Sequence, residues 1–258
     1  MPAAGPELCI VMPAYNEEGC IQEVVKKWLS AIDALGVTSG ALVVVNDGSK
    51  DRTGALLDEV AKTLPKLVVV HQPNGGHGKA LRTAYDKAVQ LGARWVFHVD
   101  SDDQFDSSEI SLLWNRRSES NFMLGFRRER HDALHRLVIT RVLRVLNFVL
   151  FGTWLRDSNI PFRLIQGDYL HILLDQISPT VFAPNIFLSV LAARDGQKLM
   201  SQPISHRERG TGVVSIVRWR LIKACLRCVR ELIDFRLSLG AALKQIKTRR
   251  QALNLGGR

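Results

Sequence analysis

The chain contains 258 residues, 46% of them hydrophobic, and has a formal net charge of +10. This length and hydrophobic content exclude a disordered tail and allow one large domain, or two small ones, with a full core. The positive charge predicts an anionic partner, which can be a nucleic acid, an anionic membrane surface or a phosphorylated substrate.

The first half of the sequence alternates short apolar runs with amphipathic helical patterns. The apolar runs predict strands at residues 8–12, 41–45, 67–70, 95–99 and 121–125. The amphipathic patterns predict helices at residues 18–35, 53–63, 78–91 and 107–116. Strands that alternate with helices form βαβ units, so we predict an α/β fold in which helices cover a mostly parallel central sheet.

The second half shows a different pattern, in which arginines interrupt apolar helices. Residues 131–151 and 216–247 predict two long basic amphipathic helices, with short mixed segments between them. We therefore predict a main domain over residues 1–214 and a basic C-terminal helix and tail over residues 215–258. The C-terminal segment can contact a membrane surface, a second copy of the chain or neither.

Two features bear on the cellular location. The apolar stretch at residues 137–155 contains Arg141 and Arg144, whereas a membrane-spanning helix needs about 20 mostly uncharged residues. Four cysteines in this length, with no secretory signal before Pro13, predict a reducing environment. We expect a cytoplasmic protein that lies peripherally on the cytoplasmic face of a membrane.

Acidic residues follow the strand predicted at residues 95–99. Asp100 and Asp102 occupy alternate positions, which places them near one another at the carboxyl end of the strand, where α/β folds bind ligands. Such a pair suits Mg²⁺ or Mn²⁺. The alternative is that the segment caps the next helix, with Asp106 as the N-cap and Glu109 completing a capping box. Both can hold, because they use different residues.

Polar clusters also follow the first three strands. Pro13–Glu18 forms a turn able to hold a planar ring. Asn46–Asp51 offers Gly48 for a tight turn and Asp47 as an acceptor for a base or ribose. Asn74–Lys79 brings glycines to a helix start that favours phosphate. Each cluster also fits ordinary turn chemistry, but their convergence on one sheet edge predicts a site for a nucleotide diphosphate and a divalent cation.

The clusters follow one another in the order of a known enzyme family. The chain resembles the inverting glycosyltransferases of family 2, which have the GT-A fold, and within them the polyprenyl-phosphate sugar transferases such as dolichol-phosphate mannosyltransferase. The resemblance extends over roughly residues 7–215. The matching segments are residues 11–18, 44–51, 74–80, 100–104, 125–127, 136–141, 157–163 and 203–212.

The resemblance implies an activity and a set of site residues. The activity would be metal-dependent transfer of a sugar from a GDP- or UDP-sugar to a polyprenyl phosphate of the dolichyl or undecaprenyl type. The residues implied for the nucleotide sugar are Pro13, Ala14, Tyr15, Glu17, Asn46, Asp47, Lys79, Asp100, Ser101 and Arg209. Those implied for Mg²⁺ or Mn²⁺ are Asp100, Asp102 and Gln104, and those for the acceptor phosphate are Arg127, Arg136 and Thr140. The residues closest to the chemistry would be Asp102, Asp157 and Arg209.

Three departures from the family pattern leave the donor sugar and base open. Asn46 stands where the family usually has an acid. The segment after Arg209 lacks the usual Glu-Ser-Lys, and residues 185–192 lack the acidic residue common upstream of it.

Two other functions fit parts of the sequence. A soluble family 2 enzyme acting on a hydroxyl would need a carboxylate to take the hydroxyl proton, and Asp157 is the candidate; alternatively, Asp157 is a structural partner of Arg156 or Arg163. A nucleic-acid-binding protein would fit the charge. We expect no nucleic-acid partner, because no DNA- or RNA-binding signature occurs and the acidic strand end would repel a phosphate backbone.

Overall fold

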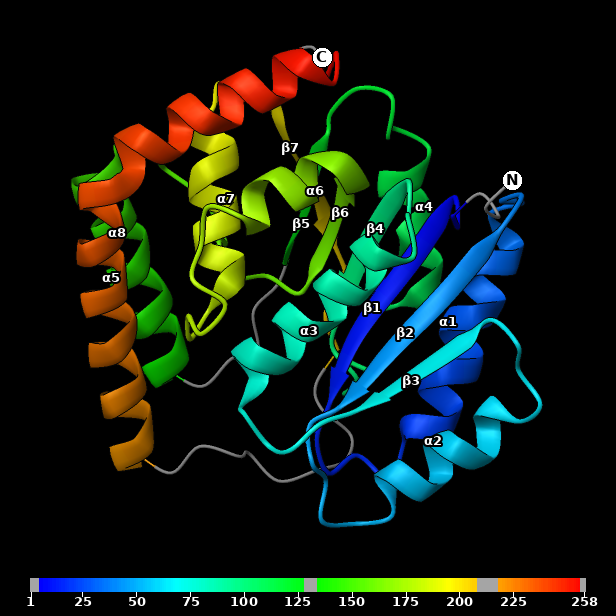
Figure 1. The fold of residues 1–258 in the computed structure, drawn as a ribbon. Helices are drawn as coiled ribbons and strands as arrows, with labels where there is room; N and C mark the ends of the chain where they lie inside the picture. Colours follow the sequence, from blue (N-terminus) through cyan, green and yellow to red (C-terminus); the bar gives the residue numbers. More distant parts are fainter. Residues whose placement is uncertain (1–4, 128–133, 208–217, 256–258) are drawn as a thin grey trace.

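The computed structural model describes residues 5–127, 134–207 and 218–255, with side chains described for all of these except residues 134–140, 218–222 and 224. Seven described strands form one sheet in the order β3-β2-β1-β4-β6-β5-β7 (Figure 1). Their bounds are β1 (Leu8–Ala14), β2 (Gly40–Asn46), β3 (Leu67–His71), β4 (Trp95–Val99), β5 (Phe122–Arg127), β6 (Phe162–Gln166) and β7 (Leu199–Ile204).

The sheet is mostly parallel, as predicted. β1 pairs in parallel with β2 and β4, β2 with β3, and β5 with β7. β6 runs antiparallel to both of its neighbours, β4 and β5. The apolar runs that predicted the central strands are buried along their whole length in β1 and β4, because helices cover both faces of the sheet. β6 and β7 lie in the region for which the sequence predicts only short mixed segments.

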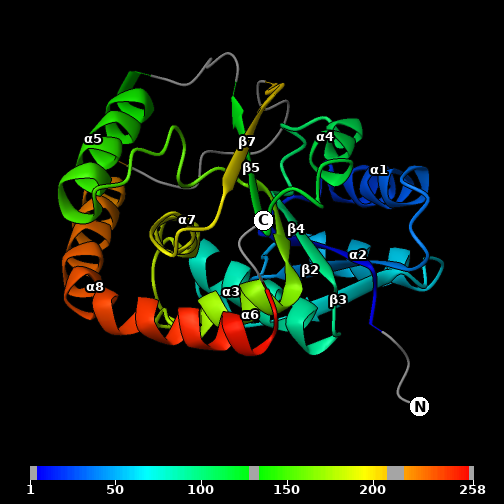
Figure 2. The same cartoon turned by 90° about the horizontal axis from the view of Figure 1, so that it is seen from above.

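The helices are α1 (Ile21–Ala34), α2 (Thr53–Ala61), α3 (His77–Gln90), α4 (Ile110–Trp114), α5 (Leu134–Phe151), α6 (Gly167–Leu174), α7 (Pro184–Arg194) and α8 (Arg218–Ala252), with a 3₁₀ turn at Ser107–Glu109 before α4. Figure 2 shows α1 and α4 on one face of the sheet and α3 and α6 on the other. The four helices predicted in the first half are thus present, the last of them as the 3₁₀ turn followed by α4.

The C-terminal helix packs into the same hydrophobic core as the rest of the chain. α8 packs against α5, α6 and α7 (Figure 2), and its residues Leu232, Phe235, Leu239 and Ile246 are buried in these contacts. The boundary predicted at residues 214 and 215 lies outside the described residues.

The strand order creates a switch point beside β1. From β1 the chain goes to β2 on one side, while β4 pairs with the other side of β1. Helices from the two directions therefore leave a crevice outside the carboxyl ends of β1 and β4, which is where open α/β sheets bind their ligands.

Candidate active site

A cavity of about 450 Å³ opens at the carboxyl ends of β1 and β4. It is lined by Pro13, Ala14, Tyr15, Glu17, Asp47, Asn74, Gly76, His77, Ala80, Asp100, Ser101, Asp102 and Phe182. The cavity thus joins the polar clusters that follow the first four strands. Its volume and its mixture of aromatic, backbone and carboxylate groups suit a ligand of nucleotide size.

The turn after β1 is joined to the turn after β2 by backbone-to-side-chain hydrogen bonds. The Asn16 N–H donates to Ser49 Oγ at 3.0 Å, and the Glu17 N–H donates to Thr53 Oγ1 at 2.8 Å. The Lys50 N–H donates back to Asn16 Oδ1 at 2.8 Å. Asn16 adopts a positive φ of 55°, which asparagine tolerates better than most residues. The two turns therefore form one rigid wall of the cavity.

Asp47 lies at the centre of that wall and is almost fully buried. Its Oδ1 accepts hydrogen bonds from Gln72 Nε2 at 2.7 Å and from the Gly75 N–H at 2.9 Å, and its Oδ2 accepts one from the Gly76 N–H at 2.8 Å. The neighbouring Gly48, which has a φ of +65°, packs closely against the glycine-rich segment, since a Cβ on it would lie 2.6 Å from the backbone nitrogen of Asn74. Asp47 thus ties the glycine-rich segment to β2, in addition to lining the cavity.

Asn46 is placed differently from Asp47. Its side chain does not line the cavity: Oδ1 accepts a hydrogen bond from the Ser49 N–H at 3.1 Å, and Nδ2 lies 3.0 Å from His71 Nδ1. Asn46 therefore shapes the turn at the end of β2.

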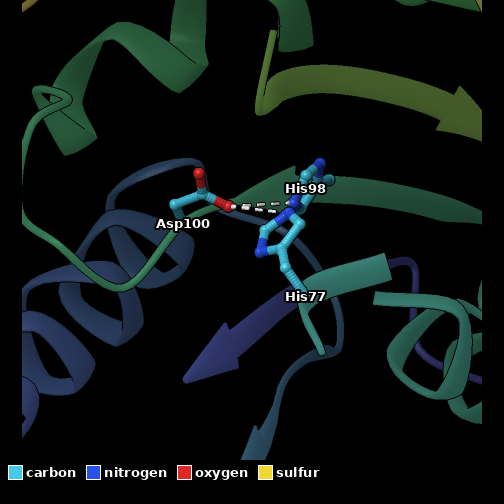
Figure 3. A group of neighbouring side chains, drawn as sticks. All are labelled: His77, His98 and Asp100. Atoms are coloured by element: carbon cyan, nitrogen blue, oxygen red, sulfur yellow. Dashed lines mark ion pairs between the residues drawn. The ribbon is translucent and has the colours of Figure 1, made fainter. Parts of the chain in front are cut away.

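Asp100, Ser101 and Asp102 form the floor of the cavity at the end of β4. Asp100 Oδ1 lies 3.4 Å from His98 Nε2 and 3.9 Å from His77 Nε2, and Figure 3 shows both imidazoles directed at this oxygen. Burial acts to raise the pKa of Asp100, but His77, His98 and Arg127 outweigh it and hold that pKa below its usual value. The Asp100 carboxylate is therefore ionised at neutral pH.

His98 is a fully buried histidine that faces this carboxylate from within β4. Burial lowers the pKa of His98 to about 4, although Asp100 acts in the opposite direction. The imidazole is therefore neutral at neutral pH.

The floor of the cavity fits a divalent cation. Asp100 and Asp102 both line it, and Asp100 Oδ1 is buried without a hydrogen bond of normal geometry to any described residue. The ligand atoms of His77, His98 and Asp100 lie within 4.8 Å of one another. Asp100 and Asp102 thus bring two carboxylates to one cavity, a donor set that Mg²⁺ and Mn²⁺ accept.

The model of a protein family described as Glycosyl transferase family 2 matches residues 9–156, which include every strand end that forms the cavity. The chain belongs to this family. It is therefore a glycosyltransferase, as the ordered motifs predicted.

Several relatives of this family 2 chain have names that give a polyprenyl phosphate as the acceptor. It is 26% identical over 213 residues to polyprenol monophosphomannose synthase of Mycolicibacterium smegmatis, covering 79% of this chain and 78% of the relative. It is 24% identical over 248 residues to a dolichyl-phosphate beta-glucosyltransferase of Trichomonas vaginalis, covering 89% and 74%. An undecaprenyl-phosphate 4-deoxy-4-formamido-L-arabinose transferase of Edwardsiella ictaluri is 25% identical over 206 residues, which cover 79% of this chain and 61% of that relative.

A solved structure shares the fold. Glucosyl-3-phosphoglycerate synthase of Mycobacterium tuberculosis, determined with Mn²⁺, uridine diphosphate and glucosyl-3-phosphoglycerate, superposes with a TM-score of 0.64 at 16% identity, covering 90% of this chain and 80% of that one. The likeness concerns the fold, which is the predicted GT-A fold.

Several residues implied by the family 2 resemblance lie beside the cavity or beyond it. Gln104 does not line the cavity; its Nε2 donates to the Arg207 carbonyl at 3.2 Å. Lys79 is exposed in the first turn of α3 and does not line the cavity either. Arg127 ends β5 and is close enough to Asp100 to lower its pKa. Asp157 is half-buried and interacts electrostatically with Arg163.

The remaining predicted positions lie outside the part of the chain that the structure describes. Arg209 lies outside the described residues, and the side chains of Arg136 and Thr140, at the start of α5, do too.

The sequence predicted Asp106 as an N-cap and Glu109 as the second residue of a capping box, and only the N-cap is confirmed. Asp106 is the N-cap of the 3₁₀ turn, and its Oδ1 accepts a hydrogen bond from the Ser108 N–H at 3.0 Å. The capping box is wrong, because the carboxylate of Glu109 accepts hydrogen bonds from the N–H and hydroxyl of Ser205, each at 2.8 Å. Glu109 therefore fastens the segment after β7 to the 3₁₀ turn that precedes α4.

Three residues of the site do not follow from the sequence motifs. His98 lies in β4 two positions before Asp100, which directly follows the strand, so the strand's alternation directs both to one side and is the signal that identifies His98. His77 lies within the glycine-rich segment, where its spacing alone does not distinguish it from a turn residue. Phe182 comes from the loop before α7, in a region without a recognisable pattern, and no sequence signal points to it.

One further observation concerns membranes. Within the described part of the chain, no helix has both the length and the hydropathy needed to cross a bilayer.

Proposed function

We propose that the chain transfers a sugar, with inversion at the anomeric carbon, from a GDP- or UDP-sugar to a polyprenyl phosphate on the cytoplasmic face of a membrane. The observation that carries the proposal is the convergence of Tyr15, Asp47, Asp100 and Asp102 on one cavity at the switch point of the sheet. The polyprenyl-phosphate relatives support the same choice of acceptor.

The proposed donor site divides the cavity between base, ribose and diphosphate. Tyr15 and Glu17 lie in the turn after β1, which hydrogen bonds join to the turn after β2, and they would contact the nucleoside. Asp100 and Asp102, which both line the cavity, would hold Mg²⁺ or Mn²⁺, whose charge would offset the negative charge on the departing nucleoside diphosphate. The start of α3, where Gly76 and His77 line the cavity, offers backbone N–H groups and an imidazole to the phosphates.

The proposed acceptor site lies beside Asp100. Arg127 acts electrostatically on Asp100, so an acceptor phosphate bound by Arg127 would lie near the donor sugar. A phosphate monoester is anionic near neutral pH and can attack the sugar without help from a base. Asp157 would then serve as a structural partner of Arg163, with which it interacts electrostatically.

One surface of the chain supports contact with a membrane. A surface of α5 and the loop that follows it, called here the α5 apolar face, exposes large side chains at 53% or more of their area: Val142, Val145, Phe148, Val149 and Trp154. The guanidinium of Arg144 lies 5.8 Å from the centre of the Trp154 ring, and Arg141 is exposed next to Val142. Apolar side chains flanked by arginines match the acyl chains and head groups of an anionic bilayer.

The test of the proposed function is ligand-induced thermal stabilisation. GDP-, UDP- and dTDP-sugars would be added in turn, with and without Mn²⁺, to protein free of detergent. A bound donor at ~100 times its dissociation constant would stabilise the protein by about 2.7 kcal/mol. Stabilisation by one nucleotide that requires the cation, followed by sugar transfer to a polyprenyl phosphate with that donor, is the expected result. No stabilisation by any donor, and no transfer, would overturn the proposal.

A further inference from the structure

A row of buried polar groups runs from the interior of the protein to Asp100. The Tyr85 hydroxyl donates to Asn185 Oδ1 at 3.0 Å, and Asn185 Nδ2 lies 3.4 Å from His98 Nδ1. His98 Nε2 in turn faces Asp100 Oδ1 at 3.4 Å. Tyr85, Asn185 and His98 are each at most 2% exposed. The row therefore connects α3, α7 and β4 to the floor of the cavity.

The orientation of the Asn185 amide, with Oδ1 toward Tyr85 and Nδ2 toward His98, implies one tautomer of His98. A Tyr85 hydroxyl that donates to Asn185 Oδ1 leaves the amide Nδ2, which can only donate, facing His98 Nδ1. His98 Nδ1 must therefore accept, and in a neutral imidazole the proton then resides on Nε2. This places an N–H opposite a carboxylate oxygen.

His98 Nε2 and Asp100 Oδ1 are also the two polar atoms at this end of the row that lack a hydrogen bond of normal geometry to the described residues. A buried donor and a buried acceptor, each unsatisfied and facing the other, are stabilised when a small rotation of the carboxylate brings them together. Figure 3 shows the second oxygen of Asp100 pointing away from both imidazoles.

We propose that His98 is a positioning residue, whose Nε2–H holds Oδ1 of Asp100 and so keeps the second oxygen available to a divalent cation. The cation part of this proposal rests on the proposed function; the hydrogen bond does not. His77 is less suited to this task, because its side chain is 56% exposed and its Nε2 lies 3.9 Å from Asp100 Oδ1. The competing role, in which His98 Nε2 is itself a metal ligand, requires the opposite tautomer.

The first measurement is the tautomer of His98 in the wild-type protein without metal. Nitrogen-15 NMR of the imidazole ring, assigned by comparison with a His98→Gln sample, distinguishes a protonated Nε2 from a bare one. We expect a neutral ring protonated at Nε2, and a loss of this preference in Tyr85→Phe, which removes the donor that orients Asn185. A bare Nε2 in the wild-type protein would overturn the proposal.

The second measurement is the affinity for Mn²⁺, read from the electron paramagnetic resonance signal of the free ion. His98→Gln keeps an N–H that can reach Asp100, whereas His98→Leu does not. We expect Mn²⁺ binding to weaken by about 10-fold or more in the leucine variant and by less than about 3-fold in the glutamine variant. The ratio of Mn²⁺ to Mg²⁺ affinity should stay unchanged, since the ligands stay oxygen atoms.

A different result would assign a different role. Equal losses in the two variants, with a selective loss of Mn²⁺ over Mg²⁺ affinity, would make His98 a metal ligand and overturn the proposal. Phe97→Leu is the matched control, because Phe97 is also buried in β4 but packs against Trp28 and Phe162. The Mn²⁺ affinity of this variant should equal that of the wild type.

If the wild-type protein binds no Mn²⁺, the metal role in the proposed function fails. The tautomer measurement still decides whether His98 Nε2 donates a hydrogen bond to Asp100. If His98→Leu does not fold, the tautomer of His98 in the wild-type protein still decides whether this hydrogen bond exists.

Discussion

Glu231 of α8 accepts a hydrogen bond from the backbone N–H of Phe182 at 2.8 Å, and Phe182 lines the candidate active-site cavity. Arg227 strengthens this link, since its Nε donates to Glu231 Oε1 at 2.7 Å and its second amino group donates to the Thr180 carbonyl at 2.6 Å. The C-terminal helix thus supports one wall of a cavity that is otherwise built from the first half of the chain.

Removing this support should weaken donor binding. Glu231→Ala leaves the Phe182 N–H without its acceptor, so the wall loosens, and we expect the affinity for the nucleotide sugar to fall about 3- to 10-fold, by roughly the net value of one hydrogen bond. Calorimetric titration of the donor is the measurement. Asp234→Ala is the control, because its ion pair with Arg230 is exposed and spans 3.9 Å. Equal affinities in the two variants would contradict a role of α8 in the site.

Gly78 should not tolerate a side chain. A Cβ at this position would lie 2.7 Å from the Val181 carbonyl oxygen and would also collide with the Phe182 carbonyl. We expect Gly78→Ala to lower the free energy of unfolding by about 1–3 kcal/mol, as overpacking does, and to distort the cavity wall. Gly240→Ala is the control, since a Cβ there meets nothing within 4 Å in α8, and alanine should stabilise that helix by up to about 1 kcal/mol. Urea denaturation measures both.

Asp102 and its neighbour Asp103 should behave differently when neutralised. Asp102→Asn is expected to abolish the cation-dependent part of donor stabilisation and to reduce transfer by about 100-fold or more, because one oxygen ligand loses its charge. Asp103→Asn should leave both unchanged, since Asp103 pairs with Lys27 at 2.7 Å and asparagine tolerates its φ of 56°. Thermal shift with and without Mn²⁺ separates the two variants, and cation-dependent stabilisation retained in Asp102→Asn would argue against the metal role.

Asp157→Asn tests the nature of the acceptor. With a phosphate acceptor, transfer should change by less than about 3-fold, because no proton has to be removed from the nucleophile. With a hydroxyl acceptor and Asp157 as the base, the loss should reach about 100-fold or more. Melting temperature must be recorded alongside, since Asp157 also acts on the buried Arg163.

The α5 apolar face should mediate binding to vesicles. Phe148→Ser and Val149→Ser together remove two exposed side chains from it, so binding to vesicles of phosphatidylcholine and phosphatidylglycerol should weaken, as measured by co-sedimentation. Leu112→Ser is the control, because Leu112 is 41% exposed on α4, at a distance from α5 in both views (Figures 1 and 2). Unchanged binding in the double variant would remove the support for this surface.

The stability of the protein should fall in acid partly through Asp106. The hydrogen bonds from Ser108, and then Arg207, lower the pKa of Asp106 in the folded state. A folded pKa below the unfolded value, about 3.9, means that the stabilisation is present above that pH and is lost as the pH falls through the folded pKa. Asp106→Asn keeps the cap but cannot titrate, so the difference in unfolding free energy between it and the wild type should shrink over this window. A constant difference would contradict the assignment.

The sequence alone determined the fold class and the place of the site. Continuous apolar runs of strand length indicate strands buried on both faces, and period-3.6 patterns indicate helices buried on one face. An alternation of the two leaves few topologies open, so the parallel strands and the cluster at their carboxyl ends follow from the pattern itself. Asp100 and Asp102 could be singled out because they end a buried strand, and the ordered motifs placed the chain in its family.

The tertiary structure decided which side chains meet. Asn185 reaches His98 across 87 positions of sequence, Phe182 enters from the loop before α7, and Glu231 supports that loop from α8, although nothing in their local sequence marks them. The same holds for Asn46, which lies next to Asp47 in sequence but turns away from the cavity toward His71. Such contacts depend on long-range packing and on side-chain rotamers, whereas sequence patterns report burial along a single element; the partners of each strand end therefore appear only once the chain is folded.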